Sequence, residues 1–191
     1  MTCIVGIKHE GGVILGGDSA GVSDFDLTVR SDPKVFYIHP VLAIGFTSSY
    51  RMGQLLRYQL PKYLDSHVTP KDVDDSFEWM VTVFAEGCRK VFADGGVNKR
   101  DNDVDRGGSF LVALAGDLFR IDSDYQVGVA ACGYEAIGCG DNYALGALHA
   151  TIGRQKDSRM AAALGAATAH SAGVCAPFVF AHTRPLKEAK P

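Results

Sequence analysis

Hydrophobic residues in the N-terminal third of the chain come in short runs separated by turn-forming residues. The run from Cys3 to Lys8 is rich in β-branched residues, and a His-Glu-Gly-Gly turn separates it from Val13 to Leu15. Two further runs, Lys34 to Ile38 and Val41 to Phe46, flank His39-Pro40. The pattern predicts two β-hairpins, so we expect this third of the chain to be mostly sheet.

The middle of the chain changes to helical periodicity. Ser48-Ser49 can cap a helix that carries apolar residues over 52–58 and that Pro61 should kink or end. At 69–72 a threonine, a proline, a lysine and an acid are typical of a helix start. Apolar residues at helical spacing follow, which predicts a long amphipathic helix that ends near Gly95-Gly96.

The second half of the chain returns to strands and then to helices. The expected elements are an exposed loop over 97–108, strands over 109–115, 118–122 and 125–131, alanine-rich helices over 142–151 and 157–171, and a final strand over 178–181. Strands, two helices, strands, two helices and a strand do not alternate as βαβ units. The order predicts a layered α+β sandwich, with helical layers covering sheet.

Length and composition indicate one globular domain. A chain of 191 residues can bury about 70% of the surface that its unfolded form exposes. Its 47% hydrophobic and 21% charged residues are typical of a globular protein and not of a disordered one. We expect a single domain over residues 1–184, followed by a tail at 185–191.

Several functional classes are not expected. The net charge of −3 offers no basic stripe for nucleic acid. The sequence has no basic start followed by an apolar stretch, which would predict a leader, and no run of about 18 apolar residues, which would predict a membrane span. We therefore expect a cytoplasmic protein. The five cysteines lack C-x-x-C spacing and indicate reduced thiols without a metal site. No glycine-rich segment has the form of a phosphate loop, so no cofactor is expected.

The start of the chain contains a candidate nucleophile. A threonine hydroxyl reacts poorly unless a base takes its proton, and a chain-terminal threonine carries that base in its α-amino group, with a pKa of about 7.7–8.0. Removal of Met1 would place Thr2 there. Taken singly, Thr2 is an ordinary small second residue, Asp18 a turn former and Lys34 a strand-end lysine. Their combination is more specific, because this chemistry needs a nucleophile, a cation beside it and an orienting acid.

A threonine, an aspartate sixteen positions later and a lysine sixteen beyond that resemble the proteasome β-subunit family and the related bacterial heat-shock-locus peptidase. Mature chains of this N-terminal nucleophile hydrolase family begin with Thr and carry a catalytic Asp and Lys at these spacings. The resemblance covers nearly the whole chain. It implies a four-layer αββα sandwich of two antiparallel sheets between helical layers, and hydrolysis of peptide bonds through an acyl-enzyme on Thr2.

The resemblance also implies further site residues. The sequence Ala-Ile-Gly-Phe around Gly45 is similar to the family strand whose glycine amide forms the oxyanion hole, so Gly45 is the expected donor. The segment around Cys139 is similar to the family's G-S-G segment, but Cys139 replaces a serine that lies near the terminal amine, and a thiol is a weaker donor and acceptor. Cys139 can equally be a small buried residue. His170 and Gly173 fall near the places of a family aspartate and serine.

Electrostatics suggests the roles of the charged pair. The Lys34 ammonium should stabilise negative charge on the Thr2 hydroxyl oxygen and lower the pKa of the terminal amine, while Asp18 keeps Lys34 charged and oriented. The resemblance further implies a peptide or protein substrate and a homo-oligomeric ring of six or seven subunits. An ATPase partner, if the protein has one, leaves no mark in the sequence.

Two alternatives remain open. The first is another amidase on the same fold that acts on a small molecule, since a fold does not fix a substrate. The second is a catalytically silent ring or scaffold subunit, suggested by Cys139 and by the missing acid near His170. A retained Met1 would block the terminal amine and favour the second alternative.

Overall fold

In the computed structural model, which describes residues 1–65 and 75–185, the first hairpin forms the centre of a sheet covered on both faces. Strand β1 (Cys3–His9) pairs with β2 (Gly12–Gly17), and nearly every residue of the two strands is buried. Successive side chains of a strand point to opposite faces. Ile4 therefore packs into the core between the sheets, whereas Val5 packs against helices.

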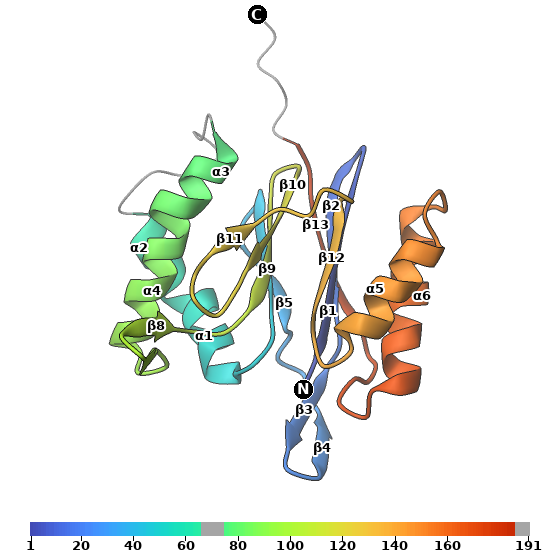
Figure 1. Cartoon of the computed structure of the whole chain (residues 1–191), viewed down its shortest axis with the longest axis horizontal. Coiled ribbons are helices and arrows are strands. Elements are labelled where there is room, and N and C mark those ends of the chain that lie inside the picture. The colour runs from blue at the N-terminus through green and yellow to red at the C-terminus, as the bar shows by residue number, and fades with distance from the viewer. Residues whose placement is uncertain (66–74, 186–191) are drawn as a thin grey trace, which may run out of the picture.

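Two antiparallel sheets lie face to face in the middle of the molecule (Figure 1). In the order of their pairing, the first sheet consists of β12 (Tyr134–Gly138), β1, β2 and β13 (Val179–Thr183), and the second of β11 (Val127–Gly128), β10 (Asp117–Ile121), β9 (Phe110–Leu114), β6 (Leu42–Phe46) and β5 (Val35–His39).

Helices cover the outer face of each sheet. Those outside the second sheet are α1 (Tyr50–Tyr58), α2 (Leu60–Leu64), α3 (Ser76–Trp79), the π-helical turn η2 (Met80–Phe84) and α4 (Ala85–Asp94), and those outside the first are α5 (Asp141–Ala150) and α6 (Lys156–His170) (Figure 1). This arrangement confirms the predicted four-layer αββα sandwich. No helix in the described ranges is long and apolar enough to cross a membrane.

The helix boundaries follow the sequence signals at most ends. The Ser49 side chain accepts a hydrogen bond from the Met52 N–H at the start of α1, and Pro61 lies in the first turn of α2. Helix α4 ends at Asp94 with Gly95 as its C-cap, close to the predicted end near Gly95-Gly96. The start predicted at 69–72 lies outside the described residues. The described helix begins only at Ser76, because Asp75 is extended and caps it.

Three segments differ from the expectation. The predicted loop over 97–108 contains a hairpin of β7 (Lys99–Asp101) and β8 (Val104–Arg106), and the segment after Asp18 contains another of β3 (Ala20–Ser23) and β4 (Asp26–Val29). Both hairpins are largely exposed, so no buried hydrophobic run marks them. Strand β12 was not expected either. Residues 186–191 of the predicted tail lie outside the described residues.

Candidate active site

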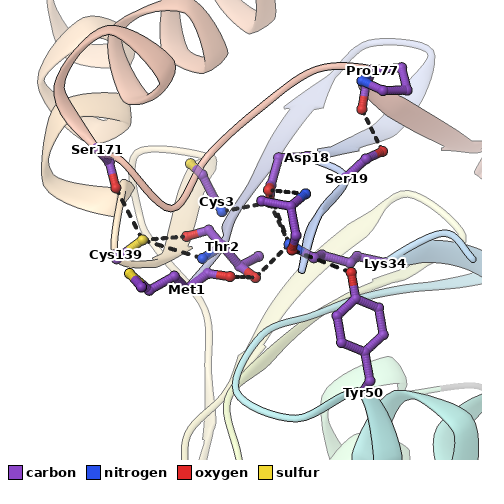
Figure 2. Close-up of polar contacts among 11 residues, drawn as sticks. Met1, Thr2, Cys3, Asp18, Ser19, Lys34, Tyr50, Cys139, Ser171 and Pro177 are labelled. Carbon is purple, nitrogen blue, oxygen red and sulfur yellow. Dashed lines mark hydrogen bonds and ion pairs between the residues drawn. The ribbon is translucent and has the colours of Figure 1, made fainter. Parts of the chain in front are cut away.

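The site lies at one end of the two sheets, where three segments meet. Thr2 precedes β1, Asp18 follows β2, and Lys34 precedes β5. The first two come from one sheet and the third from the other, so the packing of the two sheets brings them together. Figure 2 shows the three side chains converging from these segments. The structure thus places the sequence-predicted Thr2, Asp18 and Lys34 in direct contact.

The Lys34 ammonium links the other two side chains. Its Nζ lies 2.8 Å from Thr2 Oγ1 and 3.0 Å from each carboxylate oxygen of Asp18. The side chains of Lys34 and Asp18 are only 2% and 0% exposed. Buried charges require partners, and each charge here finds the other (Figure 2).

Backbone groups hold the Asp18 carboxylate in place. Its two oxygens accept hydrogen bonds from the N–H groups of Cys3, at 2.9 Å, and Ala20, at 2.8 Å. The backbone of β1, through Cys3, and that of β3, through Ala20, therefore fix the orientation of the carboxylate. The carboxylate in turn fixes the position of the Lys34 ammonium. Burial lowers the pKa of Lys34 from its ordinary value, and the Asp18 charge offsets part of that shift.

Cys139 lies beside the backbone of Thr2. Its Sγ is 3.3 Å from the Thr2 nitrogen, which donates to it, and 3.5 Å from the Thr2 carbonyl oxygen. The preceding Gly138 has a φ of +103°, and a side chain there would collide with the Thr2 carbonyl. A glycine is therefore needed for this close approach. The structure brings Cys139 to the position that the sequence suggested.

Ser171 is a site residue that the sequence analysis missed. Its Oγ lies 3.1 Å from Cys139 Sγ, so the two side chains form a chain of polar groups that leads to the Thr2 nitrogen (Figure 2). The neighbouring candidates do not join it. The His170 ring packs against Tyr143 on the exposed side, and Gly173 faces the Met1 side chain. The sequence predicts a helix over 157–171 that includes Ser171, whereas α6 ends at His170 and leaves Ser171 free to turn toward Cys139.

Two further thiols near Asp18 stay protonated at neutral pH. Burial, together with the Asp18 charge, raises the pKa of Cys3 to about 12. Burial also raises the pKa of Cys175. Because the thiolate is the reactive form of cysteine, these side chains are poor nucleophiles. No group of three or more His, Cys, Asp or Glu side chains within the described ranges is placed to hold a metal ion.

Gly45 is the predicted site residue that the structure does not bring to Thr2. It lies inside β6, between Val35 of β5 and Leu111 of β9, and a side chain at Gly45 would meet Ile4 in the core. Glycine is needed there for packing between the sheets. Its amide faces the neighbouring strand and not the Thr2 pocket.

Ser48 offers the better-placed amide. The N–H groups on either side, of Thr47 and Ser49, bond to backbone carbonyls, whereas that of Ser48 donates to no group in the part of the chain that the structure describes. Ser48 has a φ of +72° and lines the same pocket as Thr2. Its N–H is thus a candidate donor to an oxygen that develops negative charge in this pocket.

Comparison with known proteins gives structural matches only. No protein-family model and no curated protein sequence matches the chain. Eukaryotic HslV from Trypanosoma brucei has a TM-score of 0.72 at 21% identity, with 95% of this chain and 99% of that chain covered. BPH from Thiobacillus denitrificans, in complex with epoxomicin, has a TM-score of 0.74 at 15% identity, with 95% and 98% covered.

A third match is the Anbu (Gly-1) mutant from Hyphomicrobium sp. strain MC1, with a TM-score of 0.72 at 14% identity and coverage of 96% of this chain and 82% of that chain. At such identities the likeness shows the fold. The chain has the same fold as HslV and these other solved structures, and the chemistry of its site must be argued from its own residues.

The buried ion pair predicts a large effect on stability. Lys34→Met should fold but lower the free energy of unfolding by about 3 kcal/mol, because it leaves the Asp18 charge buried without its cation. The matched control is Lys90→Met, which breaks an exposed pair with Asp94 at 3.2 Å and should cost under about 1 kcal/mol. Urea unfolding measures both. Equal losses in the two variants would contradict the assigned importance of the Lys34–Asp18 pair.

Proposed function

We propose that this chain is an N-terminal threonine hydrolase that cleaves peptide bonds through an acyl-enzyme on Thr2, after Met1 has been removed. The observation that carries the proposal is the hydrogen bond of 2.8 Å between Lys34 Nζ and Thr2 Oγ1, with both oxygens of Asp18 behind the ammonium. A hydroxyl in contact with a buried, oriented cation is suited to lose its proton, because the cation stabilises the resulting negative charge.

Removal of Met1 supplies the base. With Met1 present, the Thr2 nitrogen is an amide and the Thr2 hydroxyl donates to the Met1 carbonyl oxygen. Cleavage of the Met1–Thr2 peptide bond turns the Thr2 nitrogen into an amine, which still lies beside Cys139 Sγ. It also frees the Thr2 hydroxyl from its hydrogen bond to Met1. The Met1 side chain also leaves the face of Gly173. Nucleophile and base then belong to one residue.

The reaction follows in two halves. The Thr2 amine takes the hydroxyl proton, directly or through a water, and the Thr2 oxygen bonds to the carbonyl carbon of the substrate. The carbonyl oxygen becomes negative and accepts a hydrogen bond from the Ser48 N–H. The carbon–nitrogen bond then breaks, and the Thr2 ammonium gives its proton to the leaving amine. Water next attacks the ester on Thr2, with the amine again as base, and releases the acid.

Cys139 and Ser171 position the amine in this scheme. The thiol contacts the Thr2 nitrogen and carbonyl oxygen, and Ser171 Oγ contacts the thiol at 3.1 Å. Because a thiol is a weaker hydrogen-bonding group than a hydroxyl, Ser171 supplies the stronger polar group of the pair. We assign neither residue to the bond-making step.

The substrate preference rests on Tyr50. With Met1 in place, a pocket of about 40 Å³ lies beside Thr2 and Lys34, and it is lined by Met1 as well as by Phe46 and Tyr50. One water needs about 10–15 Å³ of such volume, so the pocket holds roughly three waters while Met1 is present, and loss of Met1 enlarges it on the side of the nucleophile. A pocket of about 210 Å³, which includes Asp26 and Arg30, lies at the same tyrosine.

Three contacts hold the Tyr50 ring between the two pockets. The Arg30 guanidinium lies 3.8 Å from the ring centroid, the hydroxyl donates to the Ala20 carbonyl at 3.3 Å, and the Phe46 ring meets it edge-on at 5.7 Å. A ring fixed in this way is a wall and not a movable gate. Because the ring limits the depth of the pocket, the proposed substrate is a peptide or protein cleaved after residues with short side chains. The proposed setting, which the pocket does not address, is a cytoplasmic, homo-oligomeric ring.

The nucleophile can be identified by covalent labelling. BPH from Thiobacillus denitrificans binds epoxomicin, an epoxyketone, and such a group needs both the hydroxyl and the free amine of a terminal threonine to form its ring adduct. Protein shown by intact mass to lack Met1 should gain one inhibitor mass. Thr2→Ala should gain none, and Thr2→Ser should retain some labelling, because serine keeps the oxygen and the amine.

The same measurement separates the alternatives. Protein that retains Met1 should take up no label, because its Thr2 nitrogen is an amide. Label on Cys139 or Cys3 would mean thiol chemistry and would contradict the role of Thr2. If Met1-free protein neither takes up label nor cleaves an amide, the scaffold alternative is the better one. Labelling without peptide cleavage would favour an amidase that acts on small molecules.

Tyr50→Ala should widen the substrate range. Without the ring, the two pockets join, so the ratio of kcat/KM for a peptide cleaved after leucine to one cleaved after alanine should rise by about tenfold or more. Tyr50→Phe should keep the wild-type ratio, because the ring remains. Fluorogenic peptide amides that differ only in this residue provide the assay. A wild-type preference for leucine would contradict the assignment of Tyr50 as the wall of this pocket.

A further inference from the structure

The β3–β4 hairpin carries apolar side chains that no other described segment of the chain covers. Phe25, in its turn, is fully exposed, and Leu27 and Val29 of β4 are 45% and 55% exposed. Leu27 and Val29 occupy alternate positions and therefore share one face of the strand. Figure 1 shows the hairpin projecting beyond the end of both sheets.

The hairpin belongs to neither of the two larger sheets. A two-stranded hairpin alone is only marginally stable in water, and exposed apolar side chains on it add nothing to its stability unless something covers them. Acids flank the exposed ring, because the tip sequence is Asp24-Phe25-Asp26. The tip therefore presents one aromatic side chain between two negative charges.

A groove on the outer helices has the complementary chemistry. It has a volume of about 400 Å³ and lies between α1, α2 and α4. Its floor includes the buried side chains of Leu55 and Val91, and three cations line it, namely Arg51, Lys62 and Lys90. Among the lining residues that the structure describes, Asp94 is the one acid, and it pairs with Lys90 at 3.2 Å. The described lining keeps an excess of positive charge, and the groove has room for a phenyl ring.

We propose that the Asp24-Phe25-Asp26 tip of one copy of this chain docks into the groove formed by α1, α2 and α4 of a second copy. Phe25 is the buried anchor, on the floor made by Leu55 and Val91. Aromatic anchors in apolar pockets carry most of the binding energy of many interfaces, and the acids set the register against Arg51 and Lys62.

The contact is heterologous, because it joins two different surfaces. The hairpin projects from the end of the sheets, whereas the groove lies on the outer helical layer (Figure 1). In an open row of copies, the copy at one end therefore has an unoccupied tip and the copy at the other end an unoccupied groove. Docking of these two surfaces closes the row into a ring. The tip is an anchor and not the whole interface, since a stable interface buries about 1,200–2,000 Å² in total. This inference names the surfaces of assembly and does not depend on hydrolysis by Thr2.

Single substitutions test the tip. Sedimentation velocity at micromolar concentration should show the wild type well above the 20.4 kDa of one chain and Phe25→Asp at that mass. Because Phe25 is fully exposed, circular dichroism of the variant should stay that of the wild type. The matched control is Val104→Asp, on the other exposed hairpin at 43% exposure, which should assemble as the wild type does. A monomeric wild type, or a Phe25→Asp variant of wild-type mass, overturns the proposal.

Mixing two defective copies tests the pairing of tip and groove. Phe25→Asp loses the tip and keeps the groove, and the double variant Arg51→Glu, Lys62→Glu loses the groove and keeps the tip. Each should be monomeric alone, whereas an equimolar mixture should form a one-to-one dimer through the intact tip and the intact groove. A mixture that stays monomeric, or a groove variant of wild-type mass, means that the tip binds elsewhere and overturns the assignment.

Discussion

The buried ion pair between Lys34 and Asp18 is the interaction on which the site depends. Both side chains are withdrawn from water, which costs free energy that only close and complete pairing can offset. The pairing is complete, because Asp18 accepts two backbone N–H groups as well as the ammonium. Two N–H groups of the ammonium face the Asp18 oxygens, and the third points at the Thr2 hydroxyl oxygen, which lies 2.8 Å from Nζ.

The two sheets determine that geometry. Thr2 and Asp18 lie at the ends of paired strands, because the register joins Ile4 to Gly17, and Lys34 enters from the facing sheet. A shift of one residue in this register would turn every side chain of β1 to the opposite face. The hydrophobic alternation of β1, with Ile4 toward the other sheet and Val5 toward the helices, prevents such a shift. Packing of the core thereby determines the directions in which the side chains of Thr2, Asp18 and Lys34 point.

The parts of the structure that could be predicted are those that leave a periodic or spaced signal. The β1–β2 and β5–β6 hairpins, the last two helices and the positions of Thr2, Asp18 and Lys34 belong to this group. Gly45 shows why the rest could not: packing against Ile4 requires a glycine there, and sequence alone does not distinguish this from a glycine that presents its amide to a substrate. Ser171 and the Ser48 amide depend on how distant segments pack, which no local pattern encodes.

The hairpin and the site are parts of one continuous structure. Strand β3 begins at Ala20, whose N–H holds Asp18 at 2.8 Å and whose carbonyl accepts the Tyr50 hydroxyl at 3.3 Å. The same strand pairs with β4, which carries the exposed apolar side chains. A second copy seated on the tip would therefore restrain the strand that orients the carboxylate. Assembly and chemistry would then be coupled through one short hairpin. A restraint on the tip would limit the motion of β3, and Ala20 at the start of β3 holds the Asp18 carboxylate.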